Sequence, residues 1–388
     1  MHVAVIFGGV SVEHEVSILT GLQALHALRA SRHTAYPLYI DKQGRWYTGE
    51  ALRELETFRN LEALARKAVC VAPIRTPQGD VVVQELDSPR WRRPRRWPLD
   101  VALLALHGGE GENGGLQGLL ETLDVPYTGS GVLGSALGMD KVVTKFLCLA
   151  NQLPVLPFVW FRERDWEHDP EQYLLRAEEL GYPLIVKPAR LGSSIGVGWA
   201  EHRAALEEAI ELAFRFDDKV LIEPALKERQ EVNCAVLGTP SAARVSVCEE
   251  PLGLDAVLSY TDKYLRGDPQ KGMAGAERRI PAAISAEQAR QLEELALRVF
   301  QLFELSGTAR VDFLIDRRTG SVYINEVNTI PGSLAFYLWE RSDLPFVELL
   351  EQLIRIALDR YRVKQTRTRS YETNLLAHKS QTGLKLHK

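Results

Sequence analysis

Residues 182–198, YPLIVKPARLGSSIGVG, place a lysine at the end of an apolar strand and a turn of small residues directly after it. Lys187 offers a positive charge to phosphate oxygens, and the glycines let backbone N–H groups approach a phosphate closely. The turn also carries Ser193 and Ser194. Because the lysine precedes the glycines, the stretch is not a P-loop. It predicts another kind of phosphate-binding loop, and the alternative is a buried strand followed by an ordinary surface loop.

Residues 307–332, GTARVDFLIDRRTGSVYINEVNTIPG, have the pattern of a β-hairpin, with two alternating runs joined by a charged turn. Alternate side chains share a strand face, so Arg310 lies beside Asp312, and Glu326 lies beside Asn328. A turn with an odd number of residues brings all four onto one face. Two carboxylates and an amide oxygen suit Mg²⁺. The hairpin therefore predicts a magnesium site, and a solvated face with an Arg–Glu pair is the alternative.

The composition favours a soluble enzyme of two or three domains. The chain has 388 residues, of which 45% are apolar and 25% charged, and this is too long for one compact core. Its 47 basic and 51 acidic residues disfavour a dedicated nucleic-acid binder. The four cysteines form no CxxC pair and suit reduced thiols. We expect neither a signal peptide nor a membrane span.

Two short motifs suggest other functions. Residues 129–134, GSGVLG, match the GxGxxG pattern of an NAD-dependent oxidoreductase, but no acidic residue follows at about 20 positions to hold a ribose. We expect a turn there, leading into a helix that contains Met139, Asp140 and Lys141. Residues 90–97, RWRRPRRW, suggest nucleic-acid binding. Without a wider basic excess, an exposed hairpin is the better interpretation.

Eight motifs follow one another along the chain between about residue 3 and about residue 339. In order they are IFGGVSVEHEVS, LHGGEGENGGLQG, GSALGMDK, KPARLGSSIG, EVNCAVLG, DKY, ARVDFLID and INEVNTIPG. In this order they resemble the motifs of the D-alanine–D-alanine ligases, a family of the ATP-grasp superfamily. The resemblance covers nearly the whole chain.

The resemblance implies a fold of the α/β and α+β classes, namely ATP-grasp with an N-terminal Rossmann-like (pre-ATP-grasp) domain, a small central domain and a C-terminal mixed-sheet domain. We expect the N-terminal substrate domain at residues 1–138, with an insertion near 42–98. The central domain with the phosphate loop then spans 139–222, and the C-terminal domain with the metal site and a lid spans 223–362. Residues 363–388 are expected to form a flexible basic tail.

The resemblance also implies the chemistry. ATP would phosphorylate the carboxylate of a first D-alanine, and the amine of a second would attack the acyl phosphate to give D-alanyl-D-alanine for peptidoglycan synthesis. Two Mg²⁺ ions, or Mn²⁺ in their place, would be held by Asp312, Glu326 and Asn328 and would neutralise phosphate charge. We further expect a cytoplasmic homodimer that binds neither nucleic acid nor membranes.

The resemblance assigns roles to single residues. Glu15 would bind the ammonium group of the first D-alanine, with Ser193 and Tyr264 linking it across domains, although a carboxylate at a helix start is also a common dipole partner. Arg310 and the N–H of Gly332 would form the oxyanion hole. The residues assigned to ATP are Lys141, Lys187, Ser193, Ser194, Glu223, Glu231 and Lys263. Those assigned to the second substrate are His107, Glu112 and Ser333. For His107, a role in fixing the glycine loop is an equal alternative.

Three expectations concern specificity and motion. Residues 258–275, which include Lys263 and Tyr264, are polar and glycine-rich and are expected to close over the reactants as a lid. After Gly332 the chain continues with SLAFYLWE, where the family has a threonine and serine run that holds the second carboxylate. Ser333 is a candidate substitute. A ligase for D-lactate, D-serine or another amino acid therefore stays open, as does a silent ATP-binding protein.

Overall fold

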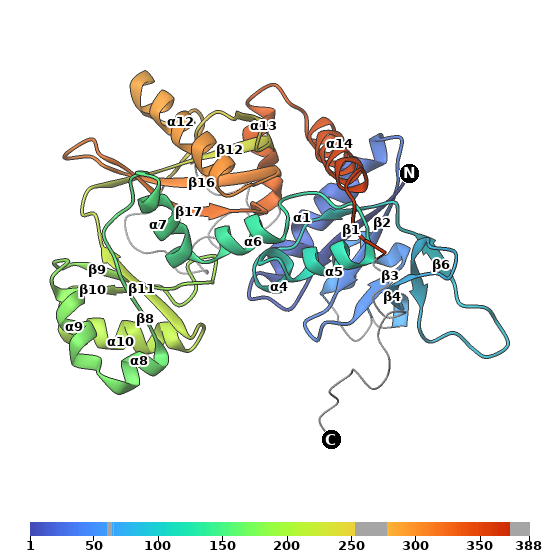
Figure 1. Cartoon of the computed structure of the whole chain (residues 1–388), viewed down its shortest axis with the longest axis horizontal. Coiled ribbons are helices and arrows are strands. Elements are labelled where there is room, and N and C mark those ends of the chain that lie inside the picture. The colour runs from blue at the N-terminus through green and yellow to red at the C-terminus, as the bar shows by residue number, and fades with distance from the viewer. Residues whose placement is uncertain (60–63, 65, 253–277, 373–388) are drawn as a thin grey trace.

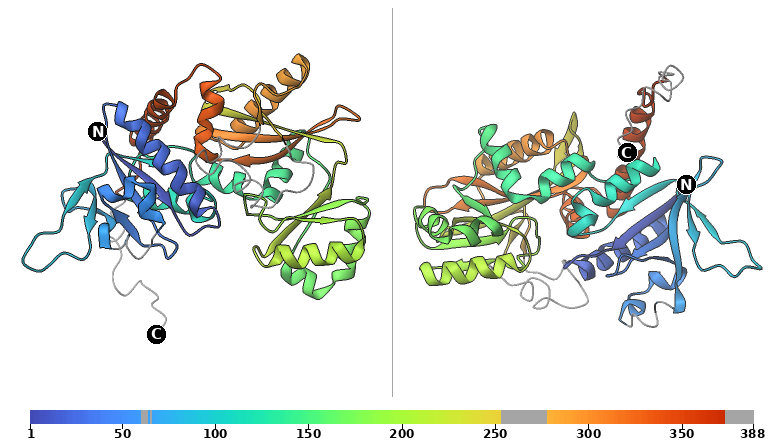
Figure 2. Two further views of the ribbon diagram at one scale, coloured as in Figure 1. Left: turned by 180° about the vertical axis from the view of Figure 1, so that it is seen from behind. Right: turned by 60° about the horizontal axis from the view of Figure 1, so that its bottom comes forward.

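The computed structural model describes residues 1–59, 64, 66–252 and 278–372 of the chain. These residues form three larger sheets and one two-stranded sheet, with helices packed on them (Figure 1). The N-terminal sheet lies at one end of the molecule, and the central and C-terminal sheets lie together at the other (Figure 2). The expected lid, including Lys263 and Tyr264, lies outside the described residues.

The N-terminal sheet has seven strands in the order β6-β5-β4-β3-β2-β1-β7. The parallel strands are β1 (His2–Gly8), β2 (Thr34–Ile40) and β7 (Val101–Leu104). The antiparallel strands are β3 (Trp46–Thr48), β4 (Val69–Arg75), β5 (Val81–Glu85) and β6 (Arg96–Pro98). Residues 42–98, which we expected to be an insertion, thus extend the same sheet, and the RWRRPRRW segment lies in and after the loop between β5 and β6.

Helix α1 (His14–Ala27) packs closely on β1 because Gly21 lies at the contact. A Cβ atom on Gly21 would come within 2.4 Å of Phe7, so a larger residue would push the helix away from the strand. The other helical segments of this part are η1 (Leu28–Ala30), η2 (Glu50–Arg53), α2 (Leu55–Phe58), α4 (Gly109–Glu112), α5 (Gly115–Leu123) and α6 (Val132–Met139). The C-terminal helix α14 (Phe346–Gln365) shares this hydrophobic core.

The central sheet has four antiparallel strands in the order β10-β9-β11-β8. They are β8 (Val159–Arg162), β9 (Leu184–Pro188), β10 (Gly198–Ala200) and β11 (Lys219–Pro224). Helices α8 (Glu163–His168), α9 (Pro170–Glu178) and α10 (Arg203–Phe214) pack on it (Figure 1). The apolar run of β9 is buried in this core, which leaves Lys187 near the end of the strand.

The C-terminal sheet has the order β13-β12-β16-β17. Its strands are β12 (Arg229–Thr239), β13 (Ala242–Val245), β16 (Gly307–Asp316) and β17 (Val322–Asn328). Its three pairings are all antiparallel, whereas we expected a mixed sheet. Helix α12 (Ala286–Leu302) shares its core and begins with a capping box of Ser285 and Gln288. The remaining elements are α7 (Lys141–Ala150), β14 (Glu250–Pro251), β15 (Arg278–Arg279), η4 (Gly332–Ala335) and α13 (Phe336–Glu340).

The predicted hairpin and the shared face of its four polar side chains are confirmed. Arg310 pairs with Asn328, and Asp312 pairs with Glu326, so all four side chains lie on one face. A bulge follows Asp312 and adds Asn325 to the partner strand. Near the turn Ile315 pairs with Val322, and this register alone would set Asp312 opposite Asn325. The bulge, and not an odd number of turn residues, therefore brings Glu326 onto the face of Asp312.

The helix expected to contain Met139, Asp140 and Lys141 is instead two helices. Helix α6 ends at Met139, and Asp140 has an extended backbone. Its carboxylate accepts hydrogen bonds from the N–H groups of Val142 and Val143, each at 3.1 Å, and so caps α7. Aspartate is a strong N-cap residue, which explains the break. Lys141 consequently stands at the first position of α7.

None of the helices in the described part of the chain is both long and apolar enough to cross a bilayer.

Candidate active site

Two lysines bring the phosphate loop against the C-terminal hairpin. Lys141 Nζ donates to the carbonyl of Leu191 at 2.7 Å and lies 3.3 Å from Oε2 of Glu326. Lys187 Nζ donates to Oδ1 of Asn325 at 3.1 Å. The two lysines therefore meet the acidic hairpin between the central and C-terminal sheets, although these segments are far apart along the chain.

Glu223 is buried and ion-paired with two lysines. Its carboxylate contacts Lys187 and lies 2.8 Å from Nζ of Lys145. Burial opposes ionisation of this carboxyl, but Lys145 and then Lys187 outweigh it and lower its pKa to about 2. Two ammonium groups share one carboxylate here, which leaves positive charge for an anionic group. Lys145 was not among the predicted residues, although its position four residues after Lys141 on α7 puts both on one helix face.

The hairpin face holds a compact charged group. Arg310 donates to both carboxylate oxygens of Asp312, from Nε at 2.6 Å and from Nη2 at 2.7 Å. Asn328 Nδ2 donates to Oδ2 of the same carboxylate at 3.0 Å. Burial and, to a smaller extent, the nearby Glu326 raise the pKa of Asp312 to about 6 against the opposing effect of Arg310.

These residues fit a magnesium ion. Asp312 and Glu326 stand directly opposite each other, and hard oxygen donors of this kind are the ligands of Mg²⁺. Across the described ranges, no group of three or more His, Cys, Asp and Glu side chains could hold a metal. Asn328, on the same strand face, carries an amide oxygen and is the candidate for a third protein ligand. A cation would also relieve the repulsion between the two carboxylates.

Glu13, and not Glu15, connects the phosphate loop to the N-terminal sheet. Ser193 donates to Oε1 of Glu13, and a Cβ atom on Gly192 would lie only 2.6 Å from Oε2 of that carboxylate. Glu15 instead has a side chain that is 59% exposed and pairs with Lys42 at 2.6 Å. The expected link between Ser193 and Glu15 is thus wrong.

The physical reason is helical geometry. Glu13 occupies the N-cap position of α1, beside the glycine-rich turn, whereas Glu15 is two residues into the helix. Two residues correspond to a rotation of about 200° around a helix axis, so the second carboxylate faces away from the loop. Helical periodicity in the motif EHE could therefore have indicated that Glu13 and Glu15 face different directions.

Glu112 and His107 anchor the segment that follows β17. Glu112 accepts hydrogen bonds from the N–H groups of Gly108 and Ile330, both at 2.9 Å. Burial, and then the charge of Glu13, raise the pKa of Glu112 to about 7. Burial lowers the pKa of His107 to about 4, so its ring is neutral near pH 7.

The tautomer of His107 follows from its two partners. Its Nδ1 lies 2.8 Å from the carbonyl oxygen of Ile330, which can only accept, so Nδ1 carries the proton. Its Nε2, 2.7 Å from Oγ1 of Thr20, is then the acceptor for the hydroxyl. Thr20 Oγ1 also accepts from the N–H of Ser333 at 3.0 Å. His107 thus orients the start of the SLAFYLWE segment.

The chain after Gly332 turns in an unusual conformation. Ser333, Leu334 and Ala335 have φ angles of 53°, 54° and 53°, in the left-handed region, although none is a glycine. Such a residue costs about 1–2 kcal/mol in this conformation. All three are buried, so packing holds the strained turn in place. The strain lies where Ser333 is expected to meet the second substrate.

A buried cluster beside Arg310 was missed from the sequence. Glu249 accepts from Oη of Tyr337 at 2.8 Å and from Nη1 of Arg278 at 3.0 Å. The guanidinium of Arg278 lies 4.3 Å from the centre of the Tyr337 ring. Tyr337 belongs to SLAFYLWE, where the chain departs from the family motif, and this departure is the signal that could have indicated the cluster.

Three other predicted residues are located as follows. Ser194 lies in the phosphate loop with a φ angle of 56°. Gly332 begins η4, directly after the hairpin. Glu231 on β12 pairs with Arg229 at 3.1 Å and faces away from the C-terminal core.

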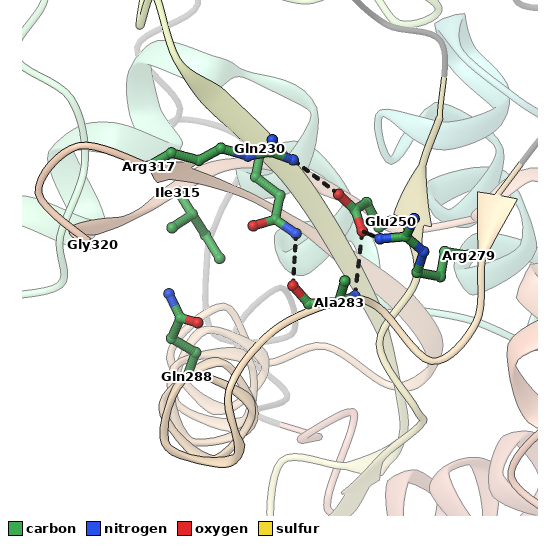
Figure 3. Close-up of a pocket in the computed structure, with 8 residues that line it drawn as sticks. All are labelled: Gln230, Glu250, Arg279, Ala283, Gln288, Ile315, Arg317 and Gly320. Atoms are coloured by element: carbon green, nitrogen blue, oxygen red, sulfur yellow. Dashed lines mark hydrogen bonds and ion pairs between the residues drawn. The ribbon is translucent and has the colours of Figure 1, made fainter.

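A separate hollow of about 420 Å³ lies away from these residues (Figure 3). Gln230, the neighbour of Glu231 on β12, lines it, and adjacent strand residues face opposite sides. Glu250 in this hollow pairs with Arg279 at 3.3 Å and with Arg317 at 3.2 Å. Its opposite charges thus satisfy one another, and we assign no ligand to it.

Lysines from strand β9 and helix α7, set against the carboxylates of the β16–β17 hairpin, define an ATP-grasp enzyme. Family models described as "D-ala D-ala ligase N-terminus" and "D-ala D-ala ligase C-terminus" match residues 2–130 and 147–355. The chain therefore belongs to the D-alanine–D-alanine ligase family of ATP-dependent ligases, and the resemblance noted in the sequence is confirmed.

Individual relatives agree with this assignment. The chain is 39% identical to D-alanine–D-alanine ligase of Thermosipho africanus, over 97% of this chain and 98% of the relative. It is 37% identical to that of Bacillus cytotoxicus, over 93% and 96%. Among solved structures, the ligase of Coxiella burnetii superimposes with a TM-score of 0.79 at 30% identity, over 94% of this chain and 96% of the other. The VanG D-Ala:D-Ser ligase of Enterococcus faecalis gives 0.76 at 29% identity, over 92% and 99%. The predicted ATP-grasp fold is confirmed.

Proposed function

We propose that this protein uses ATP to join two D-alanine molecules into D-alanyl-D-alanine for peptidoglycan synthesis. The observation that carries the proposal is the meeting of Lys141 with Glu326 and of Lys187 with Asn325, which sets a phosphate-binding loop against a pair of facing carboxylates. We also propose that it acts as a cytoplasmic homodimer.

The lysines bind the triphosphate in this mechanism. Lys187 leaves part of its interaction with Glu223 when phosphate oxygens approach, because Lys145 continues to neutralise that buried carboxylate. Lys141, at the start of α7, supplies a second charge. Glu231 accepts from ribose hydroxyls, and Ser193 and Ser194 present the loop backbone to the γ-phosphate.

Asp312, Glu326 and Asn328 would hold two Mg²⁺ ions, with Mn²⁺ as an alternative. When bound, these ions neutralise charge on the transferring phosphoryl group. Arg310 keeps Asp312 ionised in its buried setting, because it donates to both of its oxygens. The carboxylate is thus available for cation binding although burial raises its pKa.

The first D-alanine binds through its ammonium group to Glu13, which takes the role expected of Glu15. The carboxylate of this D-alanine then faces the γ-phosphate of ATP and becomes an acyl phosphate. Attack by the second amine forms the C–N bond and expels phosphate. Arg310 and the N–H of Gly332 stabilise the oxyanion of the tetrahedral intermediate. Lys263 and Tyr264 keep their proposed roles in the lid.

The second substrate is the less constrained part of the proposal. D-Serine is a specific second candidate, because the strained turn at Ser333 replaces the family's threonine and serine run and a D-Ala:D-Ser ligase is among the similar solved structures. His107 and Glu112 support this turn from the N-terminal sheet.

One experiment separates these outcomes. The protein is incubated with Mg-ATP, D-alanine and, in parallel, D-serine or D-lactate, and the products are identified by mass. We expect D-alanyl-D-alanine and D-alanine-dependent release of ADP. A mixed product with D-serine in preference to D-alanine would support the second candidate, and ATP binding without any product would contradict both.

A further inference from the structure

Two cysteines stand opposite each other on neighbouring strands of the C-terminal sheet. Asn233 on β12 exchanges both backbone hydrogen bonds with Glu249, at 2.9 and 2.8 Å. The next residues along are Cys234 on β12 and Cys248 on the facing segment. This places the two cysteines in the position without backbone hydrogen bonds between them. The register shifts directly after them, because Val236 pairs with Val245.

That position matches the geometry of a disulfide. Residues of an antiparallel pair without hydrogen bonds have Cα atoms about 4.5 Å apart and side chains on the same face. A disulfide joins Cα atoms that are about 4.4 to 6.8 Å apart. The two side chains therefore lie on one face, within reach of an S–S bond, beside the register shift that follows them.

The surroundings of the two thiols differ in a way that favours oxidation. Cys234 is fully buried in the core under α12, whereas Cys248 is half-buried at its edge. The interaction with Cys234 lowers the pKa of Cys248, and the interaction with Cys248, together with burial, raises the pKa of Cys234. The accessible thiol is thus the better nucleophile, and the buried thiol lies in place to resolve a mixed disulfide.

The pair lies directly behind the proposed active site. Asn233, next to Cys234, pairs with Asp312 across the ladder. Glu249, next to Cys248, holds Tyr337 and Arg278. Adjacent residues on a strand face opposite sides, so a change at the thiols on the core side acts on residues on the active-site side.

We propose that Cys234 and Cys248 form a redox-active dithiol whose oxidation to a disulfide slows the ligase reaction. Oxidised glutathione, a disulfide oxidant, serves as the electron acceptor. The Cys248 thiolate attacks it and releases one glutathione thiol. Cys234 then attacks the mixed disulfide, forms the S–S bond and releases the second glutathione, so that two electrons and two protons pass to the oxidant. The effect on turnover rests on the proposed function, whereas the disulfide itself does not.

The test uses the full chain, oxidised with glutathione disulfide and digested without reductant. We expect mass spectrometry to find the peptide of Cys234 joined to that of Cys248, lighter by two hydrogen atoms than the sum of the two. Turnover should fall severalfold and return after treatment with dithiothreitol. A Cys248→Ala variant should keep its activity in oxidant, and Cys70→Ala, a change in a half-buried thiol of the N-terminal sheet, should stay sensitive.

The absence of the joined peptide, or a fully joined protein with unchanged turnover, would overturn the proposal. Cys234→Ala serves as a second variant if Cys248→Ala fails to fold, and it should also prevent the joined peptide. A reduced protein that makes no dipeptide would contradict the proposed function, and the joined peptide would then still decide whether the dithiol exists.

Discussion

Lys145 Nζ lies 2.8 Å from Oε2 of Glu223, and both side chains are buried. This pair fixes the carboxylate that also contacts Lys187. Because Lys145 satisfies one side of Glu223, Lys187 can exchange its carboxylate partner for phosphate oxygens. The phosphate-binding lysine thus depends on a lysine that touches no phosphate in the proposed mechanism, and Lys145 is a positioning residue.

Replacement of Lys145 by methionine should therefore destabilise the protein and weaken ATP binding. Removal of one partner of a buried ion pair typically costs about 3–5 kcal/mol. The KM for ATP should rise because Glu223 would then hold Lys187 alone. Chemical denaturation and steady-state kinetics measure the two effects. Lys42→Met is the matched control, since that lysine pairs with Glu15 at an exposed position. A Lys145→Met protein as stable as the parent would contradict the prediction.

Glu13→Gln should lower kcat/KM for D-alanine by about ten- to a hundredfold, which corresponds to the loss of about 1.5–3 kcal/mol for a hydrogen bond to a charged group. Glu15→Gln should change it little, because that carboxylate is exposed and faces away from the loop. Measurement of kcat/KM for D-alanine in both variants, at saturating ATP, shows which glutamate of the EHE motif binds this substrate. Equal losses in both variants would show that the assignment of Glu13 is mistaken.

Arg310→Lys should lower kcat by about 10²- to 10³-fold, as expected for loss of an oxyanion donor. Lysine cannot donate to both oxygens of Asp312 as the guanidinium does. Nucleotide binding, measured by calorimetry, should be preserved much better than turnover. Arg317→Lys is the control, because Arg317 lies at the turn of the same hairpin and pairs with Glu250 away from the site. An active Arg310→Lys enzyme would remove this residue from the chemistry.

The hairpin could be predicted from the sequence because its pattern is local. Alternation of apolar and polar residues indicated which side chains share a face on each strand, whereas the register of Asp312 against Glu326 depends on the bulge after Asp312 and not on the turn. The phosphate loop was predictable in the same way, since Lys187 and the following glycines lie within one short stretch.

Contacts between distant segments could not be predicted in this way. Lys145 meets Glu223 and Glu13 meets Ser193 only because segments far apart in the sequence pack together. The break at Asp140 was hidden because both sides of it favour helix, and only the cap of α7 shows where one helix ends. The left-handed turn that begins at Ser333 contains no glycine that would have indicated it in the sequence. Its backbone conformation follows from packing and not from local preference.

The pH dependence of stability should report the environment of Glu112. Burial, and then Glu13, raise its pKa from 4.5 to about 7 in the folded protein. Between these pH values the folded state binds the proton more tightly than the unfolded state, so this group stabilises the fold most below pH 4.5, and its contribution falls as the pH rises towards 7. The change corresponds to about 3 kcal/mol.

Glu112→Gln isolates this contribution, because His107 and Asp312 titrate in both proteins and their effects cancel in the difference. The pKa of His107 is lowered and that of Asp312 is raised, so their own contributions run in opposite directions with pH. We expect the free energy of unfolding of the parent, relative to Glu112→Gln, to decrease steadily from about pH 4.5 to about pH 7 in urea titrations. Glu110→Gln, an exposed position of the same short helix α4, should give a flat difference. A flat difference for Glu112→Gln as well would mean that this carboxyl ionises normally in the folded protein and that the buried link from Gly108 to Ile330 does not perturb it.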